Sequence, residues 1–418
     1  MEVFSSAAKT DRVRPIQRLK HDQMSPSENP RSFSGRCRLP ASLAQRLDGS
    51  HLPSLDGLRA IAAFMVVFYH CFLPAFPGGM GVLAFFVLSG FLITWLLLKE
   101  EERFGTVSLK FFYVRRALRI FPAFYAYWFL LMGAHVIAGK RIAMGQAIAS
   151  LLYVGNYYQA IIGDPKTGLS HTWSLGVEEQ FYLLWPITFL WLKGNQRRMR
   201  FLLWSIAGVW LYRELLVLFV HAPQQYVYQA FEARADHLMI GCLLAVALRE
   251  GLWTPLWRSL VAVQSLVWLT LGLLACSVVC TDRYGSTYRD AIGFIVDPIL
   301  IAILIVQVIA HSSVGFAAVL NWRWVRYLGT ISYGIYLYHG HAILVADKVT
   351  GTLPAVVSMF IGILSVIAVA SASYWFLEEP LLRMRARFMP GQLPRNPVVP
   401  HDADSLTTLP TPPRDART

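Results

Sequence analysis

Long apolar runs, separated by short polar and basic segments, make up most of the chain after residue 55. Ten of them are near the length of about 20 residues that a helix needs to cross a bilayer. They lie at about residues 58–76, 80–98, 120–138, 177–192, 201–220, 231–248, 260–279, 291–310, 327–346 and 356–377. A further stretch, Ile148 to Ile162, is short and interrupted by Gly155 and Asn156. The pattern predicts an all-α integral membrane protein: a bundle of about ten transmembrane helices plus a short non-crossing or re-entrant segment.

Composition supports a membrane protein. The chain has 418 residues, of which 55% are apolar and only 15% charged, and its mean hydropathy is +0.45. A soluble protein of this length could not bury so many apolar runs. The net charge is +13, but most basic residues lie between the runs, as in cytoplasmic loops, and do not form a nucleic-acid-binding groove. The five cysteines have no spacing typical of a metal site or a disulfide framework, and no metal is predicted.

The placement of Lys and Arg predicts the orientation of the spans. Basic residues are frequent in the first fifty positions, in the loop after the second run and at 193–200, 321–326 and 383–387. All of these groups fall on the same side of the membrane only if the stretch 148–162 does not cross. We therefore predict ten spans in the plasma membrane with both termini cytoplasmic, and an external or re-entrant segment at 139–176.

The same reasoning divides the chain into three parts. Residues 1–54 are polar and basic and lack the apolar core of a signal peptide, so we predict a disordered cytoplasmic tail. Residues 55–380 form the predicted membrane domain. Residues 381–418 contain Pro and Asp and are predicted to be a second disordered cytoplasmic tail. The sequence leaves the oligomeric state open.

The first run carries two ionisable residues, Arg59 and His70, eleven positions apart. Eleven residues are about three helical turns, so both side chains share one face and lie roughly 16 Å apart along the axis. Ionisable residues inside a membrane helix are costly and often functional. The alternative is that Arg59 reaches the interface and His70 is a hydrogen-bonded core residue. The two residues alone leave both interpretations open.

Two further pairs carry candidate chemistry. Arg116 and Arg119 are neighbours on a helix surface, where a guanidinium pair can bind phosphate or simply anchor the helix at the cytoplasmic face. Glu178 and Glu179 stand at the start of the fourth run. They point about 100° apart, so at most one of them faces inward well, where it could partner a histidine. The alternative is that both acids stabilise a helix N-terminus.

Single polar residues inside other runs complete the candidates. The second run contains glycines and Ser89, and small residues of this kind permit close helix packing. Trp173 precedes the acidic pair, Asp236 lies where the sixth run begins, and Tyr333 and His339 lie in the ninth run. Mutual pairing that satisfies buried charge is the alternative role for the charged members.

These motifs, in this order, resemble the acyltransferase-3 family of integral membrane acyltransferases over roughly residues 55–380. The elements that carry the resemblance are Arg59 with His70, Phe85–Phe91, Arg116 with Arg119, Trp173–Tyr182, Ser332–His339 and Glu378–Pro380. Some members carry an additional C-terminal hydrolase-like domain. This chain stops about forty residues after its last run, so the resemblance implies the stand-alone form.

The resemblance implies transfer of an acyl group, most often acetyl, from acyl-CoA to a hydroxyl of a carbohydrate or glycoside. Acyl-CoA would be a co-substrate, with no bound cofactor. The predicted topology agrees, because Arg59, Arg116 and Arg119 would meet the phosphates of CoA at the cytoplasmic face. We predict that His70 takes the proton of the acceptor hydroxyl and that Glu178 orients His70. A transient acyl-histidine is an alternative route.

A transporter is the competing class. A proton-coupled exporter or glycolipid flippase could use the same buried charges as a relay. No internal repeat is visible in the sequence, which counts against an inverted-repeat transporter. The acceptor and the length of the acyl chain stay open.

Overall fold

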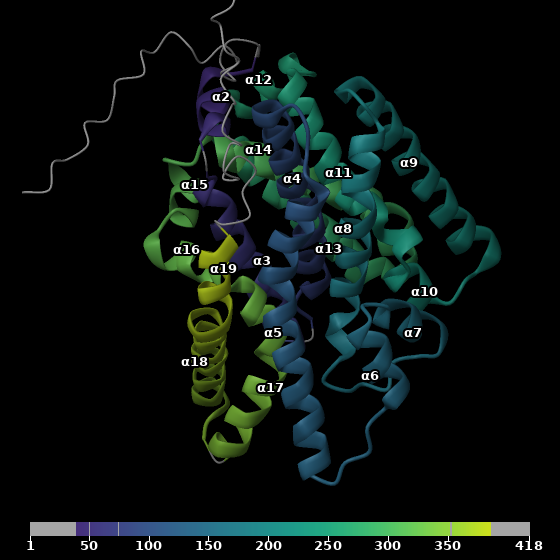
Figure 1. Ribbon diagram of the computed structural model, residues 1–418, viewed down its shortest axis with the longest axis vertical. Coiled ribbons are helices and arrows are strands. Elements are labelled where there is room, and N and C mark those ends of the chain that lie inside the picture. Colours follow the sequence, from purple (N-terminus) through teal and green to yellow (C-terminus); the bar gives the residue numbers. More distant parts are fainter. Residues whose placement is uncertain (1–38, 50, 74, 352, 386–418) are drawn as a thin grey trace, which may run out of the picture.

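The computed structural model describes residues 39–385 except 50, 74 and 352, and every regular element in this part of the chain is a helix (Figure 1). The N-terminal half contains α2 (Ala41–Asp48), α3 (Pro53–Cys71), α4 (Gly78–Phe104), α5 (Leu109–Ile137), α6 (Met144–Leu151), α7 (Gly155–Ile161), η2 (Ser170–Thr172) and α8 (Trp173–Trp191). The C-terminal half contains α9 (Asn195–Leu215), η3 (Leu216–Val220), α10 (Gln224–Gln229), α11 (Phe231–Glu250), α12 (Thr254–Ala262), α13 (Leu266–Tyr288), η4 (Arg289–Gly293), α14 (Phe294–Ala310), α15 (Gly315–Leu320), α16 (Arg323–Thr330), α17 (Ser332–Thr350), α18 (Ala355–Ser373), η5 (Tyr374–Glu378) and α19 (Glu379–Arg385).

Several of these helices are long and apolar enough to cross a membrane, which confirms the predicted multi-pass membrane protein. Six such stretches occur in the described residues: Pro53–Cys71, Gly78–Phe104, Leu109–Ile137, Asn195–Val220, Leu266–Ala310 and Ala355–Met384. The count rises to seven if Gln224–Glu250 and Thr254–Ala262, which meet at a bend of 101°, form one span. The predicted count of about ten spans is therefore not confirmed.

The difference in count has an identifiable origin in two polar helices. Helix α8 carries Glu178 and Glu179, and α17 carries two histidines together with Asp347 and Lys348. Their polar side chains lower the mean hydropathy of helices that have 19 residues each. The stretch Leu266–Ala310 differs in another way, because its backbone leaves the helical conformation at Gly285 (φ 72°) and α13 packs against α14. That stretch therefore consists of two packed helices.

The segment predicted to be external or re-entrant contains only short helices. Helices α6 and α7 have eight and seven residues, too few to cross a bilayer. They lie far from α2 along the long axis of the bundle (Figure 1). Asn156 in α7 is fully buried and donates to the carbonyl oxygen of Gln229 at 3.3 Å. Protein contacts thus satisfy polar groups of this segment, as a non-helical or broken segment at membrane depth requires.

Helix α2 corrects the prediction of a disordered tail over residues 1–54. Leu43 and Leu47 are one turn apart on α2, both are fully buried, and the helix packs against α14. The i, i+4 spacing of two leucines is the signal that the sequence reading missed. At the other end, α19 extends to Arg385, inside the segment predicted as the second tail. Residues 1–38 and 386–418 lie outside the described residues.

Helix α4 is the centre of the bundle and packs most closely against α11. The contact depends on two glycines. A Cβ atom added to Gly90 would lie 1.9 Å from the carbonyl oxygen of Leu238, and one added to Gly241 would lie 2.1 Å from that of Val87. Small residues permit such close backbone approach between membrane helices, as predicted for the second run.

Replacing Gly241 by valine is expected to destabilise the protein strongly. Overpacking typically costs about 1–3 kcal/mol, and here the added atoms meet backbone that cannot rotate away. Thermal unfolding of the purified protein in detergent measures the effect. Gly272→Val is the matched control, because Gly272 is also helical but has open space around the position of its Cβ. Equal melting temperatures of the two variants would contradict the assigned packing.

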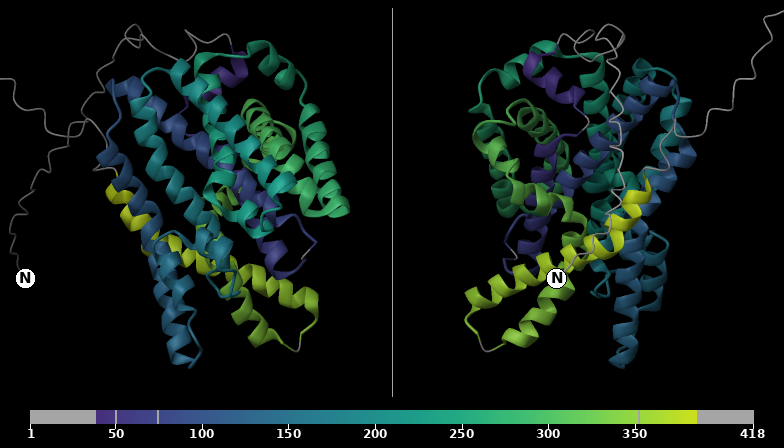
Figure 2. Two further views of the ribbon diagram at one scale, coloured as in Figure 1. Left: turned by 90° about the vertical axis from the view of Figure 1, so that its right-hand side faces the viewer. Right: turned by 60° about the vertical axis from the view of Figure 1, so that its left-hand side comes forward.

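The remaining helices position the polar residues. Helix α3 packs against α4 on one side and against α16 and α17 on another. Helices α17 and α18 form a hairpin that extends from one edge of the bundle, while the C-terminal half of α5 extends separately from it (Figure 2). This arrangement brings α3, α4, α5, α8 and α17 around a common space.

Candidate active site

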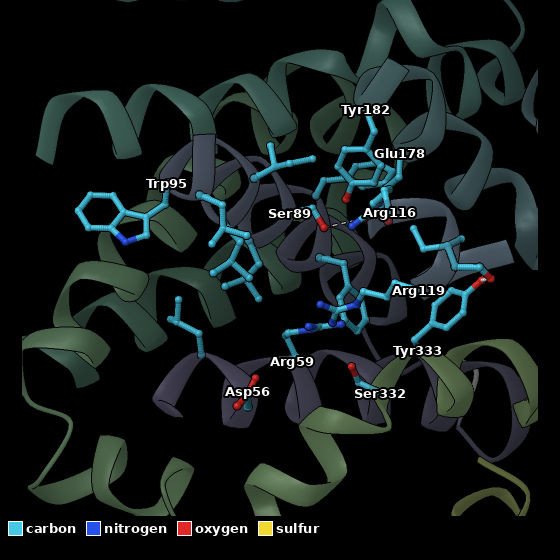
Figure 3. Close-up of a pocket in the computed structure, with 18 of the residues that line it drawn as sticks. Asp56, Arg59, Ser89, Trp95, Arg116, Arg119, Glu178, Tyr182, Ser332 and Tyr333 are labelled. Atoms are coloured by element: carbon cyan, nitrogen blue, oxygen red, sulfur yellow. Dashed lines mark hydrogen bonds between the residues drawn. The ribbon is translucent and has the colours of Figure 1, made fainter. Parts of the chain in front are cut away.

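A cavity of about 360 Å³ lies among α3, α4, α5, α8 and α17 (Figure 3). Six of the ten predicted site residues line it: Arg59, Ser89, Arg116, Arg119, Glu178 and Tyr333. Other polar residues in its wall were not predicted as site residues: His51, Asp56, Lys99, Ser174, Tyr182, Ser332 and Tyr336. Four cationic side chains and two carboxylates line the cavity, so its lining has a net positive charge. Such a cavity favours an anionic ligand.

The three arginines reach the cavity from two helices. Arg116 and Arg119 both project from α5, as their spacing predicts, and Arg59 projects from α3 (Figure 3). The guanidinium of Arg116 lies 3.5 Å from the centre of the Tyr182 ring and forms an ion pair with Glu179 at 3.4 Å. A stacked and paired guanidinium keeps a fixed orientation, which prepares its remaining N–H groups for a ligand.

Glu178 is the member of the acidic pair that faces the cavity. Its Oε1 accepts a hydrogen bond from Ser89 Oγ at 2.9 Å, while Glu179 pairs with Arg116. Helix α8 begins at Trp173, so both acids lie beyond its first turn and the role at the helix N-terminus does not apply. Of the two acids, Glu178 lines the cavity and Glu179 does not, which fits the prediction that at most one faces inward well.

His70 lies away from this cavity, at the last turn of α3. Its ring is exposed, and its centre lies 5.2 Å from that of His339, a buried residue of α17. Glu178 lines the same cavity as Arg59, and Arg59 and His70 are roughly 16 Å apart along α3. The predicted pairing of Glu178 with His70 is therefore not confirmed, because the hydrogen bond of Glu178 goes to Ser89, in the cavity that Arg59 lines.

His70 belongs to a group of imidazoles, which we call the histidine cluster: His70, His171, His339 and His341. The ring centres of His171 and His339 lie 5.0 Å apart. His339 Nδ1 hydrogen-bonds to the carbonyl oxygen of Tyr336 at 2.7 Å, and His341 Nδ1 to the Tyr127 hydroxyl at 2.9 Å. Burial and the neighbouring imidazoles lower the pKa of His171 well below its ordinary value. His171 is therefore neutral at pH 7.

Tyr336 connects the cavity to the histidine cluster. Its side chain lines the cavity, and its ring centre lies 5.6 Å from that of His171 and 6.0 Å from that of His339. Its hydroxyl hydrogen-bonds to Ser174 Oγ at 2.6 Å and donates to the carbonyl oxygen of His171 at 2.7 Å. Sequence reasoning missed Tyr336, although its three-residue spacing from Tyr333 and His339 places all three near one helix face.

Two predicted candidates lie outside both the cavity and the histidine cluster. Trp173 is buried against Phe86, with ring centres 6.2 Å apart. Asp236 is fully buried and forms an ion pair with Arg213 at 3.0 Å. Their positions fit the alternative interpretation, in which buried groups satisfy one another within the bundle.

The described residues contain no group of three or more His, Cys, Asp or Glu side chains that could hold a metal ion. The histidine cluster is therefore not such a group. The four cysteines in this part of the chain, Cys71, Cys242, Cys276 and Cys280, are free.

Comparison with known proteins identifies relatives along most of the chain. A family model described as an acyltransferase domain matches residues 52–375. The chain is 31% identical to the peptidoglycan O-acetyltransferase OatA of Listeria monocytogenes over 357 residues, which cover 80% of this chain and 56% of that protein. It is also 31% identical to YrhL of Bacillus subtilis, provisionally named a peptidoglycan O-acetyltransferase, over 79% of this chain and 55% of YrhL.

The chain thus spans little more than half the length of these relatives. No solved structure matches the chain. The family match includes every residue of the cavity wall from Leu52 to Tyr336 and all four members of the histidine cluster. Since this match covers well over half of the sequence, the chain belongs to the acyltransferase-3 family that its motifs predict.

Proposed function

We propose that this protein is a membrane O-acyltransferase that moves an acyl group, normally acetyl, from acyl-CoA to a hydroxyl of a cell-surface carbohydrate. The observation that carries the proposal is the arrangement along α3. A cationic cavity surrounds Arg59 at one end of the helix, and the histidine cluster surrounds His70 at the other. An anionic donor and a hydroxyl acceptor can therefore reach one reaction centre from opposite sides.

The donor half of the proposal rests on the cavity. Arginine pairs bind phosphate through several N–H groups at once, and Arg59, Arg116 and Arg119 project into one space. The buried Ser332 hydroxyl also lines this space and has no hydrogen-bond partner among the described residues. The pantetheine arm of CoA would extend from the arginines past Tyr336, carrying the thioester toward His70.

The acyl transfer is a substitution at the thioester carbonyl. His70 takes the proton of the acceptor hydroxyl while the oxygen attacks that carbon, and the C–S bond then breaks. The CoA thiolate leaves and takes up the proton from His70, so the enzyme returns to its starting state. His339 packs beside His70 and is held by its hydrogen bond to Tyr336, which fixes the orientation of the pair. In the alternative route, the His70 imidazole attacks the thioester carbon and expels the CoA thiolate, and the acceptor hydroxyl then displaces the imidazole from the acyl-histidine to form the ester.

The role proposed for Glu178 changes with its position. It lies with Ser89 and near Arg116, so it balances the positive charge of the cavity and holds Ser89 in place. A carboxylate in that place fixes Ser89 and offsets part of the arginine charge, and it does not act on the basicity of His70. Glu178 therefore acts on the donor side in this mechanism.

The acceptor class follows from the relatives. OatA is named as an enzyme that acetylates peptidoglycan. A peptidoglycan glycan strand is therefore the first acceptor to test, with other surface glycans as alternatives. Such polymers lie outside the plasma membrane, and His70 is predicted to face that side.

Thiol release tests the proposed function. The purified protein in lipid nanodiscs receives acetyl-CoA with and without soluble peptidoglycan fragments. We expect free CoA to form only in the presence of an acceptor, together with an equal amount of glycan ester. If acceptor glycans cross the membrane of protein-containing vesicles while acetyl-CoA stays intact, the protein is a transporter and not an acyltransferase.

The proposed orientation has its own test. Pro165, between α7 and η2, and Gln196, at the start of α9, are both exposed. A membrane-impermeant thiol reagent added to intact cells should label Pro165→Cys above the level of the parent chain, but not Gln196→Cys. The positive-inside placement of basic residues near Gln196 is the reason. Labelling of Gln196→Cys in intact cells would reverse the orientation.

A further inference from the structure

A second pocket, of about 510 Å³, adjoins the cavity. Two arginines, Arg323 and Arg326, line it together with the aromatic residues Trp324, Tyr327 and Trp375. Neither arginine has an ion-pair or hydrogen-bond partner for its guanidinium among the described residues. The first four of these residues belong to α16, which lies beside α3 (Figure 1), and Trp375 belongs to η5.

The two spaces share a wall. His51 and Asp56 line both of them, and His51 Nε2 lies 2.9 Å from Asp56 Oδ2. Asp56 is three residues before Arg59 on α3, so it stands one turn from the arginine that lines the cavity. The two spaces therefore lie next to each other, on either side of the His51–Asp56 pair.

The position of the second pocket is fixed by close packing. A Cβ atom added to Gly329 of α16 would lie 1.9 Å from the carbonyl oxygen of Asp56, so the two backbones are in contact. The Tyr327 hydroxyl donates to Ser371 Oγ at 2.8 Å, and Trp375 Nε1 donates to the Tyr327 hydroxyl at 3.3 Å. These contacts fix Tyr327 and Trp375, two of the aromatic residues that line the second pocket, relative to α3 and the cavity.

We propose that this second pocket binds the nucleotide end of the acyl-CoA donor. The adenine would stack on the exposed ring of Trp324 or Trp375, and the ribose phosphate would pair with Arg323 and Arg326, while the diphosphate stays with Arg59, Arg116 and Arg119. Stacking on aromatic rings and paired guanidinium groups are how proteins bind purine nucleotides. The inference rests on the proposed function and divides the donor into two parts, with the adenine and ribose phosphate in the second pocket and the diphosphate and pantetheine arm in the cavity.

Donor truncation tests the proposal. S-acetylpantetheine carries the same thioester as acetyl-CoA but lacks the nucleotide. In the double variant Arg323→Ala/Arg326→Ala we expect the KM for acetyl-CoA to rise roughly five- to a hundredfold, as for the loss of charged and stacking contacts. The KM for S-acetylpantetheine and the kcat for both donors should stay near the wild-type values. Adenosine 3′,5′-bisphosphate should bind the wild type, measured by calorimetry, and bind the variant more weakly by a similar factor.

Matched variants separate this role from membrane anchoring. Arg197→Ala/Arg200→Ala removes two exposed arginines with the same spacing from α9 and should leave both KM values unchanged. Trp324→Leu should weaken nucleotide binding, whereas Trp322→Leu, at an exposed position outside the pocket, should not. The proposal is overturned if Arg197→Ala/Arg200→Ala raises the KM for acetyl-CoA as much as Arg323→Ala/Arg326→Ala does, and if Trp322→Leu weakens nucleotide binding as much as Trp324→Leu. The residues of the second pocket would then belong to the lipid interface.

Two other results have distinct meanings. If the wild type uses S-acetylpantetheine as well as acetyl-CoA and does not bind adenosine 3′,5′-bisphosphate, the second pocket has no part in donor binding while the proposed function stands. If the wild type consumes neither thioester, the proposed function fails. Binding of the bisphosphate then still decides whether the pocket accepts a nucleotide.

Discussion

Replacing His70 by alanine is expected to lower the rate of acyl transfer by about 10²–10⁴-fold, the usual contribution of a general base. His70 is the exposed member of the histidine cluster, so it is the one that an acceptor can reach. The fold should persist, because alanine is a good helix former and the side chain lies at the last turn of α3. Binding of acyl-CoA should change little, since Arg59 lies about three turns away on that helix and Arg116 and Arg119 lie on α5.

The measurement is the initial rate of glycan acetylation by the purified variant, with acyl-CoA binding measured on the same preparation. His311→Ala is the control, because His311 follows α14 and belongs to neither the cavity nor the histidine cluster. A correctly inserted His70→Ala protein that acetylates glycan at the wild-type rate would remove His70 from the mechanism. His339, its buried neighbour, would then be the next candidate for the base.

The double variant Arg116→Ala/Arg119→Ala is expected to bind acyl-CoA several-fold to a hundredfold more weakly. Hydrogen bonds to charged groups contribute roughly 1.5–3 kcal/mol each, and both side chains line the proposed donor cavity. Lysine at both positions should restore binding only in part, because an ammonium group cannot form the same paired hydrogen bonds and cannot stack on Tyr182 in the same way.

Titration of acyl-CoA into the purified variants measures this effect. Arg115→Ala is the matched control, because Arg115 lies on the same helix but pairs with Glu100 at 2.6 Å and does not line the cavity. Wild-type affinity in the double variant would mean that Arg116 and Arg119 serve only to orient α5 in the membrane. Equal losses in the Arg115 variant would point to damage to α5 and not to lost ligand contacts.

The sequence predicted the features that depend on one helix. Arg59 and His70 lie on α3, and Arg116 and Arg119 project together from α5, because residue spacing on a helix determines which side chains share a face. The motif order also identified the family. These predictions need no knowledge of which helices pack together.

Contacts between helices were not predictable in the same way. Glu178 accepts a hydrogen bond from Ser89, which is 89 positions away, and Tyr336 binds Ser174 across 162 positions. Both depend on how deeply α8 and α17 are placed against α3 and α4. The prediction that Glu178 lies near the depth of His70 was not confirmed for this reason, since α8 begins at Trp173 and not near Val177 as predicted.

The span count shows a second limit. Apolar runs indicate membrane helices, but α8 and α17 carry the carboxylates and imidazoles of the site and are less apolar as a result. A functional helix therefore gives a weaker hydropathy signal than a structural one. The short helix α2 was missed because its few leucines are surrounded by polar residues.

The central claim is that one protein passes an acyl group from a CoA thioester to a carbohydrate hydroxyl. Acetyl-CoA labelled in its acetyl group, supplied to the purified protein with peptidoglycan fragments, tests this claim most directly. The account predicts that the label appears on the glycan as a base-labile ester, in an amount equal to the CoA released, and that His70→Ala abolishes nearly all of it. Label that stays on CoA with every glycan acceptor, or transfer that does not depend on His70, would contradict the account.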